Sequence, residues 1–507
     1  MKLNIIIGGK AGQGINKVSQ ILSNVLTKHG YFTFNYRDYA SLIRGGHNFN
    51  TLAISDTSIE SHDATADILV ALDERSVKTH KKALKKNGIL LTNEQFQGLG
   101  RNLNVALAGS LTKILGIPSE TLEQEIESQF KDSTEAVIAA KQGYNSQKIS
   151  HQLQKLKHSP IILSGSRALA IGAIASKLSL YIAYPMTPAT NAMHELAKDQ
   201  IKNNMIVFQA ENEIAAVSMA IGSSFAGTKT MTGTSGGGFD LMSETFSLQG
   251  ISEIPLTVYL ASRPGPGTGV PTYTAQSDLD IALRAGHGEF PRVVVAPGNP
   301  IELIEKTSEA LFLAEKFKTL SIILSDKHLA ESEFSSILKP KKTPTFKITR
   351  KIPGTDLVKN SSYETDKYGN STESYTLTEQ NVNARTKKYS DLKKYIRKNF
   401  EMCKIHGNKK SKNLVIGWGS TSGAIKDAIK DLDAKFLQVL YCKPLSPQIK
   451  KEMEKAENVI LVECNVTGQL GRLIREKTGI KIENRLLKYN GRPFHTDELN
   501  KLIKSII

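Results

Sequence analysis

Residues 204–227 read NMIVFQAENEIAAVSMAIGSSFAG and place an apolar strand directly before a helix that is rich in alanine and glycine. The same succession of strand and helix recurs through residues 159–329. The other strands predicted in this block cover residues 178–184, 228–233, 255–261, 292–296 and 321–326. Apolar strands that alternate with helices are typical of a parallel sheet covered on both faces. The predicted fold class is therefore α/β.

The rest of the chain divides around this block. Residues 1–155 also alternate strand and helix patterns, with a helix predicted from about Asn16 to Lys28. The block itself extends over residues 159–335. Residues 338–412 are rich in Lys, Thr, Ser, Asn and Tyr and show little periodicity, which predicts a polar linker or an extended segment. Residues 413–507 return to an α/β pattern. The 507 residues suit about three packed domains.

Composition excludes several classes of protein. The net charge of +17 suits acidic partners, but its lysines are spread along the chain, and we favour a generally basic surface. No zinc-finger spacing or aromatic RNA-binding signature accompanies the lysines, so we expect no nucleic-acid partner. No apolar run reaches the roughly 18 residues of a membrane span, so we expect a cytoplasmic protein that does not enter a membrane. The only cysteines, Cys403, Cys442 and Cys464, are too far apart in sequence for the closely spaced run of an iron–sulfur cluster.

A glycine-rich turn follows the first predicted strand. Residues 8–14, GGKAGQG, precede a helix, and backbone amides at such a position bind phosphate. The spacing misses the dinucleotide fingerprint, because Lys17 stands where a third glycine is needed, and no Gly-Lys-Ser/Thr closes a Walker loop. A tight turn without a ligand is an equal alternative. The glycine pair in residues 43–47, IRGGH, also suits a turn.

In the middle block, chemically capable side chains follow the predicted strands, where open α/β sheets bind ligands. Thr187 is placed to cap a helix that has Pro188 at its first position, or to aim its hydroxyl at a substrate carboxylate. Glu211 and Glu213 open the alanine-rich helix, which is predicted to contain Gly222 and Gly227. A helix dipole alone explains one acidic residue there.

Two glycine-rich loops complete this set. Residues 262–272, SRPGPGTGVPT, follow a strand, and Arg263 is placed either to grip a carboxylate with two hydrogen bonds or to lie in solvent. Residues 233–239 contain Gly236 and Gly237 in a loop suited to anions. Together, these loops at one edge of one sheet predict a site, although each alone is weak.

The motifs resemble one enzyme family when taken in order. YPMTPAT (184–190), the 209–227 stretch, TSGGGFDLMSE (234–244), RPGPGTGVPTYTAQSDL (263–279) and AGHGEFPR (285–292) resemble the α subunits of 2-oxoacid:ferredoxin oxidoreductases. GGKAGQGI (8–15) and IRGGH look like the family's γ component. GWGSTSGAI (417–425), ECNVTGQLGRLIRE (463–476) and KYNGRPF (488–494) look like its C-terminal transketolase-like domain. The resemblance covers nearly the whole chain except residues 340–412.

This resemblance implies a function that depends on a second chain. Such enzymes decarboxylate a 2-oxoacid on thiamine diphosphate, form an acyl-CoA from coenzyme A, and pass electrons through iron–sulfur clusters to ferredoxin. The α subunit implies a γ-type α/β domain, a pyrimidine-binding domain and a transketolase C-terminal-like domain. The β subunit would hold the cofactor's diphosphate, Mg²⁺ and a [4Fe-4S] cluster. This chain has no Gly-Asp-Gly motif for that magnesium and no cluster cysteines, so we expect no metal on it and no activity without the β subunit.

The resemblance also assigns roles to residues. A catalytic glutamate would bond the pyrimidine nitrogen and favour the imino tautomer, which takes the thiazolium proton. Thiamine enzymes place a helix glycine nine residues after it, which fits Glu213 and Gly222, with Glu211 in reserve. Substrate would bind at Thr187, Arg263 and Thr268. The remaining cofactor contacts would be Tyr184, Pro185, Gly236 and Gly237.

Two positions depart from the family pattern. Arg167 stands where the family often has glutamate, and Ala11 where γ domains usually have glycine. The fused arrangement and the 263–272 loop favour 2-oxoglutarate as the substrate, with pyruvate or a branched-chain 2-oxoacid as the alternative. A non-catalytic γ–α scaffold that binds coenzyme A stays open as a second class, and a nucleotide-dependent dehydrogenase is poorly supported by the glycine spacing.

Overall fold

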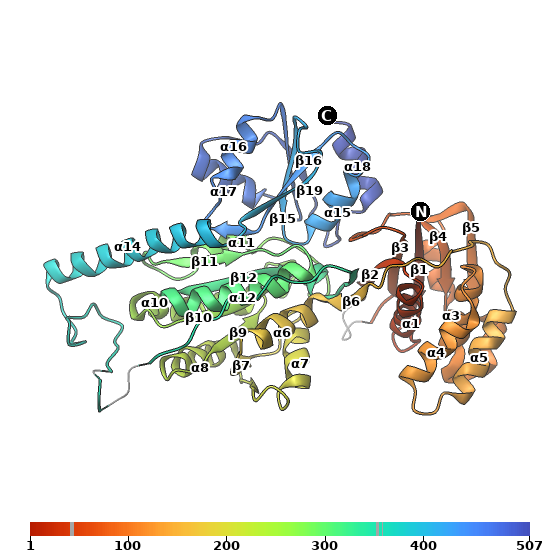
Figure 1. The fold of residues 1–507 in the computed structure, drawn as a ribbon, viewed down its shortest axis with the longest axis horizontal. Helices are drawn as coiled ribbons and strands as arrows, with labels where there is room; N and C mark the ends of the chain where they lie inside the picture. The colour runs from red at the N-terminus through yellow and green to blue at the C-terminus, as the bar shows by residue number, and fades with distance from the viewer. Residues whose placement is uncertain (41–44, 351–353, 357) are drawn as a thin grey trace. The chain divides into compact units, whose positions relative to one another are not determined.

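The computed structural model describes residues 1–40, 45–350, 354–356 and 358–507, which form two compact units. Unit 1 contains residues 1–164, 331–338 and 495–501. Unit 2 contains residues 165–330, 339–494 and 502–507. Each unit is built from strands and helices, in agreement with the predicted α/β class (Figure 1). The finer division of the chain at residues 155, 335 and 412 stays a prediction.

Unit 1 is organised around a seven-stranded sheet in the order β5-β4-β1-β3-β2-β13-β6. Its strands are β1 (Lys2–Gly9), β2 (Phe32–Asp38), β3 (Asn48–Ser55), β4 (Ala66–Ala71), β5 (Leu84–Thr92), β6 (Ile161–Ser164) and β13 (Glu333–Ser336). Only β1, β4 and β5 pair in parallel. The other pairs are antiparallel, so this sheet is mixed. The connection between β2 and β3 is too short for the crossover that parallel neighbours require.

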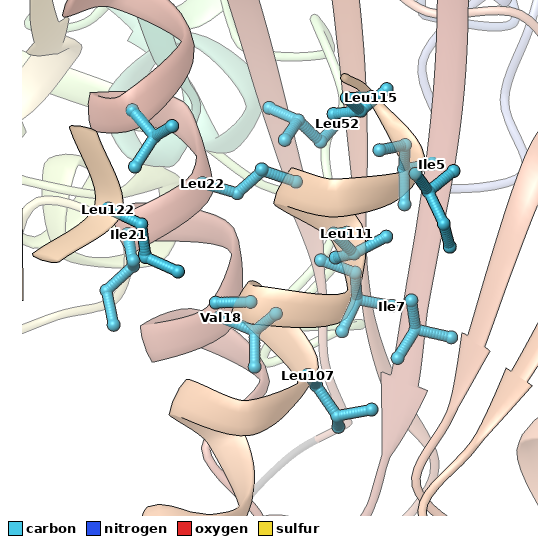
Figure 2. Close-up of a cluster of buried hydrophobic side chains, with 14 of the residues drawn as sticks. Ile5, Ile7, Val18, Ile21, Leu22, Leu52, Leu107, Leu111, Leu115 and Leu122 are labelled. Atoms are coloured by element: carbon cyan, nitrogen blue, oxygen red, sulfur yellow. The ribbon is translucent and has the colours of Figure 1, made fainter. Parts of the chain in front are cut away.

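The helices of unit 1 pack on this sheet through a continuous apolar core. They are α1 (Ile15–Lys28), α2 (Glu74–His80), the 3₁₀ segment η1 (Glu94–Asn102), α3 (Leu103–Ile114), α4 (Ser119–Gln129) and α5 (Thr134–Asn145). Figure 2 shows Ile5 and Ile7 of β1 facing Val18 of α1 and Leu107 and Leu111 of α3. Because such side chains leave water completely, each contributes about 1.5–3 kcal/mol to folding.

Two glycines allow α3 and α5 to touch backbone to backbone. A Cβ on Gly109 would lie 2.1 Å from the carbonyl oxygen of Ala140, and one on Gly143 would lie 1.8 Å from that of Ala106. Any side chain at either position would push the two helices apart. The sequences of α3 and α5 therefore specify the close contact between the two helices as well as their helical structure.

Unit 2 contains the predicted parallel sheet, in the order β17-β11-β12-β10-β9-β7-β8. Its strands are β7 (Leu180–Ala183), β8 (Ile206–Gln209), β9 (Thr230–Thr234), β10 (Leu256–Ser262), β11 (Arg292–Val295), β12 (Leu320–Asp326) and β17 (Tyr441–Lys443). All pairs are parallel except β17 with β11. The helices that accompany these strands are α6 (Gly165–Ala175), α7 (Thr190–Asp199), α8 (Glu213–Phe225), α9 (Gly236–Leu241), α10 (Ser243–Ser252), α11 (Leu279–Arg284), α12 (Pro300–Phe317) and α13 (Lys327–Glu331).

A second sheet of unit 2 has the order β14-β16-β15-β18-β19. Its strands are β14 (Cys403–Gly407), β15 (Asn413–Trp418), β16 (Lys435–Val439), β18 (Asn458–Glu463) and β19 (Asn484–Leu487), and its helices are α15 (Thr421–Ala428), α16 (Gln448–Glu454) and α17 (Gln469–Thr478). The chain ends in α18 (Thr496–Lys504). The side chain of Gln276 donates to the Trp418 carbonyl (2.7 Å) and accepts from the Cys464 amide (2.9 Å). One apolar core and such buried hydrogen bonds hold the two sheets together.

The segment expected to be a polar linker contains a long helix. α14 (Tyr375–Asn399) spans 25 residues and begins after Ser374, whose hydroxyl accepts from the Leu377 amide. α14 buries only Leu392 and Ile396, so it has little of the apolar repeat that predicts a helix. The expectation of an extended segment is therefore corrected for residues 375–399 (Figure 1).

Candidate functional site

The predicted site loops of unit 2 follow β7, β8, β9 and β10, which lie next to one another in the parallel sheet. Parallel strands bring their carboxyl ends to one edge, so the residues after these strands converge there. Contacts join the loops directly. The Arg263 guanidinium, after β10, donates to the backbone oxygen of Thr187, after β7, at 2.8 Å.

Glu213 is the first residue of α8 and points into the protein. The preceding Asn212 caps the helix by accepting from the Ala215 amide at 2.8 Å, which fixes where α8 begins. The Glu213 side chain is 3% exposed, and its Oε1 atom has no hydrogen-bond partner in the described part of the chain. Glu211, two residues earlier, is exposed. A buried carboxylate oxygen without a partner is costly, so it marks a place where a ligand is expected.

A glycine packs directly against this carboxylate. A Cβ on Gly238 would lie 2.1 Å from the Thr234 hydroxyl oxygen and 2.6 Å from Oε1 of Glu213. The predicted cofactor residues Gly236 and Gly237 open α9 just before it. Gly236 lies against Asp278, whose Oδ2 atom would be 2.7 Å from a Cβ there. The glycine run therefore brings bare backbone up to two acidic side chains.

Asp278 is a site residue to which the sequence analysis gave no role. Burial raises its pKa to about 6, and the nearby carboxylate of Asp240 adds to this, while hydrogen bonds from serine and the charge of Arg263 oppose it. The Oδ2 atom is buried and, among the described residues, has no hydrogen-bond partner. Burial lowers the pKa of Arg263, and the charges of Asp278 and Glu213 act against that shift. Arg263 thus lies within the field of both carboxylates.

Thr187 does not cap the following helix. α7 begins at Thr190 after Ala189, and the Thr187–Pro188 peptide bond is cis. The prediction of Thr187 as N-cap with Pro188 at the first helical position was therefore wrong. Residues 187–189 form a turn instead, and the Thr187 carbonyl is turned toward Arg263.

Two other predicted residues lie at the rim of this region. Tyr184 is 38% exposed beyond the end of β7, and Thr268 is exposed in the loop after β10. Within the part of the chain that the structure describes, no hydrogen bond joins either side chain to Glu213 or Arg263. Pro185 is half-buried between Tyr184 and the turn.

The glycines around α8 have different surroundings. Gly222 is exposed within α8, and a Cβ there would meet nothing within 4 Å. Gly227 was predicted inside this helix, but α8 ends at Phe225 and Gly227 has a φ of +105°. This correction has a simple cause, since a left-handed residue ends a helix and glycine adopts that conformation without strain.

The glycine loop of unit 1 closes on itself. The Gln13 side chain accepts from the Lys10 amide and donates to the Leu72 carbonyl, while Gly12 and Gly14 have positive φ. A cavity of about 430 Å³ adjoins it. Of the IRGGH stretch, Ile43 and Arg44 lie outside the described residues.

Several other expectations concern charge, metal and membrane. Arg167 forms ion pairs with Asp199 (2.5 Å) and Glu195 (3.7 Å) of α7, and both of these ion pairs lie within unit 2. Within the described ranges, no group of three or more His, Cys, Asp or Glu side chains is placed to hold a metal ion. The absence of metal from this chain stays a prediction. None of the described helices is long and apolar enough to cross a membrane.

Comparisons with known proteins agree with this geometry. Residues 171–401 match the thiamine-diphosphate-binding family of pyruvate flavodoxin/ferredoxin oxidoreductases, and residues 4–102 match the pyruvate ferredoxin/flavodoxin oxidoreductase family. The α subunit of a 2-oxoacid:ferredoxin oxidoreductase from a Sulfolobus species is 30% identical over 618 aligned positions, which cover 100% of this chain and 97% of that protein. The chain belongs to the 2-oxoacid:ferredoxin oxidoreductase α-subunit family. The family prediction is thereby confirmed.

Other relatives of this 2-oxoacid:ferredoxin oxidoreductase subunit are named for 2-oxoglutarate. Subunit KorA of a 2-oxoglutarate oxidoreductase from Mycobacterium tuberculosis is 30% identical over 68% of this chain and 57% of that protein. A solved 2-oxoglutarate:ferredoxin oxidoreductase from Magnetococcus marinus, with 2-oxoglutarate, coenzyme A and succinyl-CoA bound, superposes with a TM-score of 0.90. It is 25% identical, and the match covers 99% of each chain. The chain is therefore an oxidoreductase subunit of a multisubunit enzyme.

The residues present fit thiamine diphosphate. Glu213 offers an unpartnered, buried carboxylate oxygen, and Gly238 lets the backbone lie against it more closely than any side chain would allow. A carboxylate of this kind pairs well with a ring nitrogen that carries or receives a proton. Arg263 offers a guanidinium for a carboxylate in the same region.

Proposed function

We propose that this chain is the α subunit, with its γ region fused at the N-terminus, of an enzyme that oxidatively decarboxylates 2-oxoglutarate to an acyl-CoA and reduces ferredoxin. The observation that carries this proposal is the buried Oε1 atom of Glu213, which has no partner among the described residues and lies beside Gly238. The 2-oxoglutarate enzymes among the relatives support the choice of substrate, and the complex from Magnetococcus marinus supports coenzyme A.

The chain's own residues would divide the work as follows. Thiamine diphosphate, when bound, supplies an electron sink for the carbanion that decarboxylation leaves. Glu213 holds or gives a proton at Oε1 toward a ring nitrogen, and its burial keeps water away from that exchange. Tyr184, Pro185, Gly236 and Gly237 surround the same cofactor.

Substrate binding falls to the loop after β10. Arg263 grips a carboxylate of the 2-oxoacid, and Thr187 and Thr268 complete its polar surroundings. Support for Arg263 comes from its half-buried position and its hydrogen bond to the Thr187 carbonyl, which fixes one side of the guanidinium and leaves other N–H groups to donate.

A β subunit is the proposed partner for the exposed face of α8 and β8. Large apolar side chains lie exposed there, with exposures of 51% for Ile214, 41% for Met219, 40% for Phe225, 62% for Ile206 and 46% for Phe208. Exposed apolar groups on an edge strand and its neighbouring helix are typical of a covered surface. In this proposal the β subunit brings Mg²⁺, the diphosphate site and the [4Fe-4S] cluster.

The three cysteines are free and buried, which supports a reducing, cytoplasmic location.

The test is Glu213→Gln in the complex reconstituted with its β subunit. We expect 2-oxoglutarate oxidation, followed with a low-potential dye, to fall by about 10²–10⁴-fold, because the amide cannot exchange the proton. Glu211→Gln is the matched control and keeps full activity, since Glu211 is exposed. Co-purification of the β subunit with both variants shows that assembly is intact. Full activity in the Glu213→Gln complex would remove this residue from the proposal.

A further inference from the structure

A second cavity of unit 2 lies away from the catalytic loops. It has a volume of about 750 Å³ and is lined by residues of α11, α14, β17, α16 and α17. β17 forms one edge of the parallel sheet, where Lys443 pairs with Val294 of β11. The catalytic loops follow β7 to β10, toward the other edge. The cavity is therefore separate from the site around Glu213.

Positive charge dominates the lining of this cavity. Seven cationic side chains and two carboxylates line it. Glu476 is shared by Arg284 and Lys477, each at 2.8 Å, and the other carboxylate, on Glu454, faces Lys450 at 3.8 Å. Both carboxylates are thus already engaged.

Four cations remain without a carboxylate. Within the described residues, Lys393, Arg397, Lys443 and Lys451 have no ion-pair partner. So much uncompensated positive charge in one concave surface attracts anions strongly, because the low-dielectric walls concentrate the field.

Lys443 is the most informative of these four. Its Nζ atom donates to the Leu283 carbonyl at 3.2 Å, so the side chain is directed inward. Burial lowers its pKa to about 8, and the charges of Arg292, Lys477 and Arg284 lower it further against the opposing charge of Glu476. An ammonium held among other cations costs free energy in the empty cavity, and a bound anion would offset that cost.

Apolar side chains also line the cavity. Leu283, Leu445 and Leu473 contribute to its lining, and Tyr389 of α14 forms part of the wall, with Lys393 Nζ 4.8 Å from the centre of its ring. The volume lies within the roughly 300–1,000 Å³ of small-molecule sites. Cations that are unpaired among the described residues, beside half-buried Leu445 and Tyr389, suit a small molecule with a flat ring and several phosphates better than they suit a broad protein surface.

We propose that this cavity binds a nucleoside di- or triphosphate at a site distinct from the catalytic one. Lys393, Arg397, Lys443 and Lys451 bind the phosphates, and Leu445 and Tyr389 hold the base. The site is independent of the proposed function, because none of these residues belongs to the catalytic loops.

The experiment measures ATP binding to the full-length chain by titration calorimetry. We expect Lys443→Met and Lys451→Glu each to weaken binding by about tenfold or more, since each removes a charged phosphate contact. Methionine keeps the apolar stem of Lys443 while removing its charge and its hydrogen bond to the Leu283 carbonyl, and Lys451 is exposed, so both variants should fold. Lys398→Glu is the control: it reverses a charge on the same helix outside the cavity and should leave binding within about twofold.

Two further binding measurements test where ATP binds and whether its base contributes to binding. Arg263→Ala should bind ATP unchanged, which separates this site from the catalytic one. Inorganic tripolyphosphate should bind at least tenfold more weakly than ATP, because it has no base to contact the apolar lining residues. The proposal is wrong if ATP fails to bind below about 1 mM, if the two cavity variants bind it normally, or if tripolyphosphate binds equally well. An acidic protein that binds this face while ATP does not would also overturn it.

Discussion

Asp278→Asn should stabilise this chain by an amount that depends on pH. The pKa of Asp278 is about 6 in the folded protein against 3.8 for an ordinary aspartate, mainly because of burial. The folded state therefore holds the proton more tightly than the unfolded state. Below pH 3.8 the carboxyl is protonated in both states and costs nothing. As pH rises from 3.8 toward 6, stability is lost, and above 6 the full cost of the buried charge applies.

The size of the effect follows from the same two pKa values. Linkage gives a cost of about 3 kcal/mol at pH 7.5 and roughly half of that at pH 5. Asparagine has the shape of the protonated acid and carries no charge, so Asp278→Asn should recover these amounts. The loss of attraction to Arg263 is already contained in the folded pKa, to which that charge contributes.

Urea unfolding of the full-length chain at both pH values measures the effect. The midpoint of Asp278→Asn should exceed that of the wild type at pH 7.5, and the gap should narrow at pH 5. Glu211→Gln, which neutralises an exposed carboxylate near the same site, should show little change at either pH. A gap that is absent at pH 7.5, or that widens toward pH 5, would refute the reasoning.

Two further predictions concern shape and charge. Gly238→Ala should abolish 2-oxoacid oxidation, because its Cβ would overlap the Thr234 hydroxyl and crowd Glu213. Gly98→Ala, in unit 1, meets nothing within 4 Å and should retain activity; activity of the reconstituted complexes compares the two. ATP binding at the second cavity should weaken as pH rises through about 8, because Lys443 then loses its charge. Titration calorimetry at pH 7 and pH 9 measures this change in affinity. A chain that carries Lys443→Met should lose the pH dependence.

The strands of unit 2 were predictable because buried parallel strands are continuous apolar runs. Residues 255–261 were expected as a strand and β10 spans Leu256–Ser262; residues 321–326 were expected and β12 spans Leu320–Asp326. The sheet of unit 1 was harder. Its strands have the same apolar composition, and their direction depends on which neighbours pair, a long-range property. β13, at residues 333–336, joins a sheet formed mainly by the first hundred residues.

α14 is an element that the sequence pattern did not predict. Twenty-five residues form a helix that buries two side chains, so the helix has almost no apolar stripe. Its contacts include ion pairs, such as that of Lys388 with Glu253 and that of Arg385 with Glu364. Pairs of this kind leave no periodic signal in the sequence, and pattern reasoning therefore missed the helix.

The site likewise contains one residue that the sequence could predict and one that it could not. Spacing favoured Glu213 over Glu211, and burial of only the former supports that choice, because a cap at Asn212 turns one carboxylate inward and leaves the other outside. Asp278 could not be recognised in the same way. Its importance arises from burial and from the charge of Arg263, which precedes it by fifteen residues in a loop without regular structure.

The position of Asp278 has a consequence for the substrate. Arg263 already lies in the field of two carboxylates, and a 2-oxoacid would bring a third close to them. Three carboxylates around one guanidinium repel one another unless one of them takes a proton. Because the pKa of Asp278 is already raised to about 6, it is the group placed to do so near neutral pH. Substrate binding should therefore draw a proton onto Asp278 and so reduce the repulsion that the incoming carboxylate meets beside Arg263.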